Sequence, residues 1–201
     1  MKTSKLLIAL LLTSSSVFAE DGKFYIGASG GKTYVDGKAS AFTGTTSEDD
    51  DDTAWKIYTG YQWDNNFGIE LHYADLGDYS VSGNNGDTFR DGTGETFTFI
   101  ANGVKLTEEV ISYGASLTYS VPIMDTGFFV PLKVGFHHWD MDYADDLTGS
   151  GEDDNDLTYG VGLAYEFNEN FAIRAEYERF QLDSDDIDDI DLVTAGLTVS
   201  F

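Results

Sequence analysis

Three histidines and many hydroxyl groups are the residues of this 201-residue chain whose chemistry points most directly to catalysis. Hydrolysis or acyl transfer requires a nucleophile, a base and an orienting acid within reach of one another. His72 and His137 share the polar face of their predicted strands with Ser29, Ser112 and Glu70, so a Ser-His-Glu cluster is one hypothesis. Hydroxyl side chains also occupy that face along nearly every other predicted strand, so their presence near a histidine is weak evidence. We therefore expect no catalytic residue and no enzyme.

Carboxylates cluster in three runs, at 48–52, 152–156 and 183–189, that could supply the oxygen ligands of Ca²⁺ or Mg²⁺. None of the three runs fits the twelve-position calcium loop with its central glycine and closing glutamate. We expect solvated, flexible acidic segments that associate weakly with divalent cations, without a dedicated metal site or a cofactor. The candidates for this weak association are Asp49, Asp50, Asp51, Asp153, Asp154, Asp185 and Asp186.

The composition excludes several classes of protein. Asp and Glu number 36 against 11 Lys and Arg, and a net charge of −25 argues against nucleic-acid binding. The absence of cysteine excludes disulfides and thiolate metal sites. No segment beyond the first dozen residues is long and apolar enough for a membrane helix, whereas 22 glycines and 14% aromatic residues favour strands and turns.

The N-terminus has the pattern of a secretory signal. Lys2 and Lys5 precede an uninterrupted apolar run at 6–12, and Ala19 supplies a small residue before the expected cleavage site. We predict that 1–19 is a signal peptide and that 20–201 is the mature domain, exported from the cytoplasm.

Alternation of apolar with small or polar residues predicts eight strands, at about 24–35, 55–63, 67–74, 111–121, 130–137, 160–167, 173–178 and 193–201. One face is always bulky and apolar, and aromatic residues at the strand ends suit the two interfaces of a membrane. The opposite face carries glycine, small hydroxyl residues and a few charges, as expected of a narrow lumen. Because a sheet in a bilayer must close on itself, the pattern predicts an all-β fold, an eight-stranded antiparallel up-and-down transmembrane β-barrel with its apolar side outward.

The predicted connections alternate in length. Short turns at 64–66, 122–127 and 168–170 follow the even strands, whereas long loops at 36–53, 75–109, 140–156 and 181–191 follow the odd ones. Short periplasmic turns and long outer loops are typical of such barrels. The four long loops hold 27 of the 36 acidic residues, so the negative charge is expected to lie on the outer rim.

Two segments carry recognisable motifs. The hairpin of the second and third strands contains Gly60-Tyr61-Gln62, Gly68-Ile69-Glu70, Tyr73 and Leu76-Gly77, and the seventh strand contains Arg174-Ala175-Glu176-Tyr177. The hairpin resembles that of the OmpA-like family of small outer-membrane barrels, and the seventh strand is similar to the Arg-x-Glu-Tyr of that family. Larger members append a peptidoglycan-binding domain, for which there is no room after Phe201, so we expect the transmembrane barrel only. The resemblance also implies that the terminal Phe201 is the signal taken up by the barrel-assembly machinery.

The resemblance further implies a lumenal ion pair between Glu70 and Arg174, the positions that carry such a pair in the family. Nearer neighbours are alternative partners, such as Lys56 for Glu70 or Glu176 for Arg174. A second lumenal pair of the family has Thr118 and Ala164 at its positions here. The other charges expected on the lumen face, and expected to neutralise one another, are Lys56, His72, Lys133, Glu176 and Glu178.

These observations predict a monomeric protein of the Gram-negative outer membrane. The protein is expected to be exported through the periplasm and to contact membrane lipid. The expected role is structural or a surface interaction through the acidic loops. A small gated pore or ion channel with a salt-bridged lumen is the alternative, and a lipid-modifying enzyme is the third hypothesis.

Overall fold

The computed structural model describes residues 22–143 and 151–201. The predicted signal peptide at 1–19 lies outside the described residues. Within them, no helix is long and apolar enough to cross a membrane. The strands are β1 (Gly22–Gly37), β2 (Ser47–Asp49), β3 (Asp51–Trp63), β4 (Phe67–Gly83), β5 (Thr88–Arg90), β6 (Thr96–Thr98), β7 (Val104–Pro122), β8 (Phe128–Tyr143), β9 (Glu152–Asn168), β10 (Phe171–Gln181) and β11 (Ile187–Ser200).

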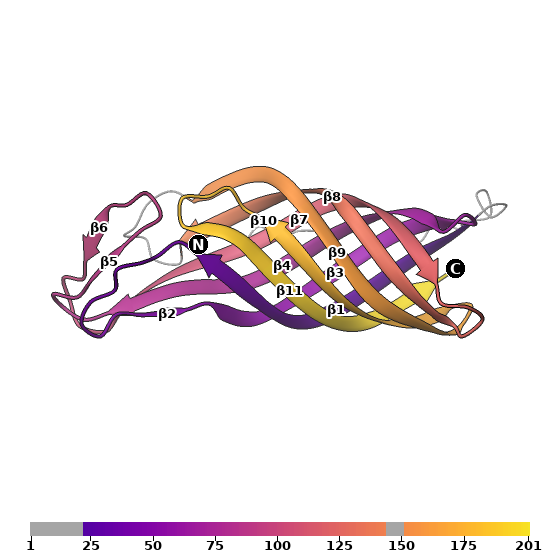
Figure 1. Cartoon of the computed structure of the whole chain (residues 1–201), viewed down its shortest axis with the longest axis horizontal. Coiled ribbons are helices and arrows are strands. Elements are labelled where there is room, and N and C mark those ends of the chain that lie inside the picture. Colours follow the sequence, from indigo (N-terminus) through magenta and orange to yellow (C-terminus); the bar gives the residue numbers. More distant parts are fainter. Residues whose placement is uncertain (1–21, 144–150) are drawn as a thin grey trace, which may run out of the picture.

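Eight of these strands form a closed antiparallel barrel. The sheet order runs β4-β3-β1-β11-β10-β9-β8-β7, and pairing of β4 with β7 closes it. Where the first and last strands meet, Phe24 and Phe201 exchange backbone hydrogen bonds of 3.1 and 3.0 Å. The predicted fold class, with each of its eight strands, is confirmed. Figure 1 shows the barrel on its side, with the strands oblique to its long axis and β5 and β6 at one end.

The two faces of the sheet follow the predicted alternation. Along β11, Val193 and Leu197 point outward and are 46% and 61% exposed, whereas Thr194 and Thr198 point inward and are buried. The apolar outer rows of neighbouring strands together form a continuous belt suited to lipid.

The strands are longer than predicted at the end where the long connections lie. β1, β4, β7, β8, β9 and β11 all extend into segments that were predicted as loops at 36–53, 75–109, 140–156 and 181–191. β2 adds to the edge of β4, and β5 pairs with β6 in a separate hairpin. The prediction of long flexible loops is therefore wrong for much of these segments.

The reason is that the polarity of the sheet inverts at this end. On β11 the outward residues change from Val193 to Asp191, while the inward residues change from Thr194 to Leu192 and Ile190, both buried. The strand continues without a break, so the same backbone first faces lipid and then water. Where the apolar residues change from the outward to the inward positions of a strand, the outward apolar row stops. A search of the sequence for that row alone therefore places the end of the strand there.

The inverted end has an apolar core of its own. We call it the head and define it as residues 33–54, 74–110, 139–143, 151–156 and 179–192. Its interior is packed with side chains that are at least nine-tenths buried: Val35, Ala54, Ala74, Leu76, Tyr79, Val81, Phe89, Phe99, Val110, Trp139, Met141, Phe180, Leu182, Ile187, Ile190 and Leu192. The head therefore resembles a small soluble barrel that continues the membrane barrel.

Candidate functional site

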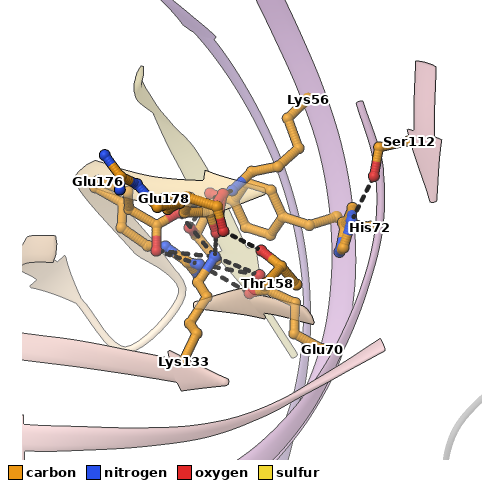
Figure 2. Close-up of polar contacts among 12 residues, drawn as sticks. Lys56, Glu70, His72, Ser112, Lys133, Thr158, Glu176 and Glu178 are labelled. Atoms are coloured by element: carbon orange, nitrogen blue, oxygen red, sulfur yellow. Dashed lines mark hydrogen bonds and ion pairs between the residues drawn. The ribbon is translucent and has the colours of Figure 1, made fainter. Parts of the chain in front are cut away.

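Six charged side chains from four strands meet at one level of the lumen. Lys56 comes from β3, Glu70 from β4, Lys133 from β8, and Arg174, Glu176 and Glu178 follow one another along the inner face of β10. All six point inward because they occupy the small-residue face of their strands. We call them the lumenal ion cluster. Figure 2 shows Lys56 and Lys133 reaching from opposite sides toward the carboxylates.

Every carboxylate of the cluster contacts at least two bases. Glu70 lies 2.9 Å from Arg174 Nη2 and 2.7 Å from Lys133 Nζ. Glu176 lies 2.8 Å from Arg174 Nη2, 2.9 Å from Lys133 Nζ and 3.2 Å from Lys56 Nζ. Glu178 contacts both Lys56 and Lys133. The cluster is thus one connected network rather than a set of separate pairs.

Two tyrosines complete this network. The Tyr25 hydroxyl donates to Glu70 Oε2 at 3.0 Å. The Tyr58 ring lies 4.4 Å from Arg174 Cζ and 5.4 Å from Lys56 Nζ, within the range of cation–π attraction. Sequence reasoning did not single out either tyrosine, although both lie on the lumen face, where a large aromatic residue is unusual among glycines and serines.

The balance of charge makes such a buried cluster possible. The side chains of Lys56 and Glu176 are 0% and 2% exposed, and the most exposed of the six, that of Arg174, reaches 8%. Burial of an uncompensated charge is costly, so a cluster in the lumen must be close to neutral. Three bases face three carboxylates, and the formal charge of the cluster is zero.

The structure places the predicted lumen residues as follows. Glu70 and Arg174 are in contact, and Glu176 also contacts Arg174, so both partners considered for Arg174 are present. Lys56 bonds to Glu176 and Glu178 rather than to Glu70. Thr118 and Ala164 are buried in the lumen wall without charge. The additional base of the network is Lys133, which lies on β8, the fourth strand that contributes to the cluster.

Two of the three histidines, His72 and His137, form a separate layer between the ion cluster and the head. Ser112 Oγ lies 2.9 Å from His137 Nδ1 and 3.5 Å from His72 Nε2, and Phe180 contacts both imidazole rings. His137 Nε2 is 3.0 Å from the Gln181 carbonyl oxygen. In the described part of the chain, neither histidine of this layer is hydrogen-bonded to a carboxylate. The Ser-His-Glu arrangement is therefore incomplete, and its serine is fully buried.

The opposite end of the lumen is open and polar. A mouth of about 450 Å³ is lined in part by the short turns at 64–66 and 122–127. Lys23 and Glu166 pair across it at 2.8 Å, with side chains 37% and 39% exposed. A narrower cavity of about 40 Å³, lined in part by Arg174, Tyr25 and Thr198, leads from the mouth toward the ion cluster. The lumen is thus accessible from the turn end down to the cluster.

The remaining predicted site residues lie outside the lumen. Phe201 ends the sheet beside Phe24 with its side chain 58% exposed. No group of three or more acidic or histidine side chains in the described residues is arranged to hold a metal ion. That statement covers the acidic candidates at 49–51, 153–154 and 185–186.

Comparison with known proteins gives the family. The chain matches the family model of the outer membrane protein beta-barrel domain over residues 6–201. It therefore belongs to that family, and it is an outer-membrane β-barrel protein. The OmpA-like type of barrel predicted from the hairpin and the seventh strand is confirmed at this level.

Solved structures with the same fold are small outer-membrane barrels. Neisserial surface protein A aligns with a TM-score of 0.56 and 16% identity, covering 89% of this chain and 97% of that one. The N-terminal barrel of Pseudomonas aeruginosa OprF gives 0.54 and 12%, covering 90% and 100%. Ail of Yersinia pestis, in complex with the heparin analogue sucrose octasulfate, gives 0.52 and 15%, covering 90% and 99%. No match was found among curated proteins.

Proposed function

We propose that this barrel has a structural or surface-interaction role: it anchors in the outer membrane and presents the acidic head to the outside of the cell. The lumenal ion cluster is the observation that carries the proposal. A neutral network of ion pairs, with side chains at most 8% exposed, crosses the lumen at one level, and the apolar core of the head lies above it. Such a filled interior favours an anchor over a diffusion channel.

The orientation can be tested with single cysteines, because the chain has none of its own. Asn102 is exposed in the head, and Asp125 is exposed in a short turn at the other end. In intact cells, a membrane-impermeant maleimide should label Asn102→Cys but not Asp125→Cys, and both variants should react after lysis. Labelling of Asp125→Cys alone in intact cells would overturn the proposed orientation.

The charge of the head limits its partners. Ail is described with a sulfated, polyanionic ligand, but the acidic residues of this head would repel such a ligand. We expect basic partners and weak, salt-sensitive association with Ca²⁺ or Mg²⁺ instead. Export through the periplasm, uptake by the barrel-assembly machinery at Phe201, a monomeric state and the absence of enzymatic activity belong to the same proposal.

A small gated pore is the second candidate, and the shared contacts of the ion cluster favour it. Glu176 contacts three bases, so the network could exchange partners without leaving a charge unpaired. Single-channel recording of the purified barrel in planar bilayers separates the two candidates. An anchor should give no discrete openings, whereas a gated pore should give openings that change in Glu176→Gln.

A further inference from the structure

A cavity of about 130 Å³ lies inside the head, away from the lumenal ion cluster. Separate parts of the chain meet around it: β4, β7, the β5–β6 hairpin, the connection from β1 to β2, and the connection from β10 to β11. Its walls are mainly apolar, formed by Ala39, Val81, Phe89, Phe97 and Leu106. Its volume is close to that of an engineered cavity of ~150 Å³ that binds benzene, so a small ligand group fits.

Four polar residues also line the cavity: Tyr79, Asp91, Glu108 and Asp186. The Tyr79 hydroxyl donates to Glu48 Oε1 at 2.6 Å. Asp91 Oδ1 accepts from the backbone N–H of Glu95 at 2.7 Å, and the Asp91 carboxylate also accepts from the Thr93 hydroxyl. The polar groups of Tyr79 and Asp91 therefore already have partners within the protein.

Glu108 differs from these residues. Its Oε2 atom is buried and has no hydrogen-bond partner within the described chain. A buried acceptor without a partner is costly, so such atoms in native proteins call for an explanation. Among the described residues that line the cavity, none is basic. The lysine of the β1–β2 connection, Lys38, is engaged by Asp188 at 2.9 Å and by the Ser184 carbonyl oxygen at 2.7 Å.

We propose that this cavity binds a primary ammonium or guanidinium group carried on a short apolar stem. Glu108 is its counterion, and Phe89 and Phe97 contact the apolar stem. Such a group is carried either by a small amine or by a lysine or arginine side chain of another polypeptide. The site is a property of the folded head and does not depend on the surface role proposed above.

The electrostatics of the head agree with this ligand class. Glu108 lies beyond the last outward apolar residue of β7, Ile111, and so outside the membrane-spanning belt. Burial, followed by the carboxylates of Asp186 and Glu152, raises the pKa of Glu108 to about 8. Tyr79 on β4 and Asp91 in the hairpin are the other titratable groups around the cavity. A bound cation favours the ionised carboxylate, so binding should release a proton below about pH 8.

The test uses the full-length barrel in detergent micelles and measures binding by calorimetry and by amide chemical shifts. The probes are n-butylammonium, n-butanol, butyrate and Nα-acetyl-lysine amide. n-Butylammonium should bind at least ten times more tightly than n-butanol, and butyrate should not bind. Tighter binding of Nα-acetyl-lysine amide than of n-butylammonium would assign the site to a polypeptide side chain, and the reverse would assign it to a free amine.

Glu108→Gln should weaken n-butylammonium binding at least tenfold, because it removes the counterion and keeps the shape. Glu109→Gln is the matched control, since Glu109 is the exposed neighbour and its loss changes the net charge equally. Equal binding of n-butanol and n-butylammonium, or equal effects of the two variants, would overturn the proposal. If Glu108→Gln fails to fold, the unmodified protein still tests the role of Glu108. Its affinity for n-butylammonium should rise from about pH 6 to pH 9, a range in which an alkylammonium ion stays charged. A flat profile would contradict the role of Glu108.

Discussion

The lumenal ion cluster allows a quantitative test of how its charges hold the barrel together. Glu176 is the most connected member, with Arg174, Lys133 and Lys56 at 2.8, 2.9 and 3.2 Å. Glu176→Gln preserves the size of the side chain but leaves three bases facing two carboxylates. Removing one member of a buried pair typically costs about 3–5 kcal/mol, because the other charge loses its compensation. We expect a loss of this size in the free energy of unfolding.

A second substitution should restore most of that loss. Lys56 contacts only Glu176 and Glu178 within the cluster, so Lys56→Met alone leaves two bases facing three carboxylates. The single variant should also cost about 3–5 kcal/mol. In the double variant, two bases again face two carboxylates, and Lys133 remains in contact with Glu178. The loss in the double variant should be smaller than the sum of the single losses by at least about 1 kcal/mol, the coupling expected of residues in one network.

The assay is urea unfolding of the barrel in lipid vesicles, followed by tryptophan fluorescence and by the gel mobility of the folded form. The control is the exposed pair at the turn end: Lys23→Met and Glu166→Gln involve the same residue types at a contact of 2.8 Å. Because these side chains are more than a third exposed, the control pair should contribute only about 0–1 kcal/mol. Additive losses for Lys56→Met and Glu176→Gln, or losses as small as those of the control, would refute the idea that the cluster acts as one network.

Three further predictions concern the belt and the head. Leu197→Arg should lower stability in lipid by about 2–4 kcal/mol, whereas Ser200→Arg on the lumen side should be tolerated, as measured by folded yield in vesicles. Trp139→Ala should cost about 3–5 kcal/mol and expose the head to amide hydrogen exchange before the membrane-spanning strands. The raised pKa of Glu108 should make the head less stable as the pH rises from about 5 to about 8, by at most about 1.4 kcal/mol per pH unit, since the folded state retains a proton that the unfolded state has lost. Hydrogen exchange should show this slope, and Glu108→Gln should remove it.

The membrane-spanning part of the fold could be predicted from the sequence because its pattern is simple. Rows such as Val193 to Val199 alternate strictly with small polar residues, and lipid on one side with a crowded lumen on the other allows few exceptions. The short turns at 64–66, 122–127 and 168–170 follow directly from where that alternation stops and restarts. The inward direction of Lys56, Glu70, Lys133 and Arg174 follows from the same period of two.

The head could not be predicted in the same way. Its strands keep the period of two, but the polar residues now lie outward and the apolar residues inward. Asp189 and Asp191 are on the same side of β11 as the lipid-facing row, and Ile190 is on the same side as the lumen row. Acidic residues next to isolated apolar ones therefore predict solvated loops. The missing signal was a reversal of the alternation, which is visible again on β8, where Val134 and Phe136 give way to Asp140 and Asp142 on the outward side.

The ion-pair partners within the cluster also could not be predicted from the sequence. Alternation assigns a residue to the lumen but not to a level along the barrel, because the level depends on the register between strands. Pairing of Gly60 with Glu70 and of Arg174 with Ala164 fixes that level only once the strands are aligned. The resemblance to a family indicated the contact between Glu70 and Arg174, and the alternation placed Lys133 and Glu178 on the lumen face without indicating which charges they would contact.

The stacking of the head on the ion cluster bears directly on the choice between an anchor and a pore. Exchange of partners among Lys56, Lys133 and Arg174 could open a passage through the cluster, but Phe180 lies immediately above it and packs against both His72 and His137. Phe180 is itself part of the apolar core that fills the head. A path for ions would therefore have to cross two barriers of different chemistry: the paired charges of the cluster and the apolar core of the head. Rearranging side chains in the cluster leaves the second barrier intact, so a conducting state would require partial unfolding of the head, and this dependence favours the anchor.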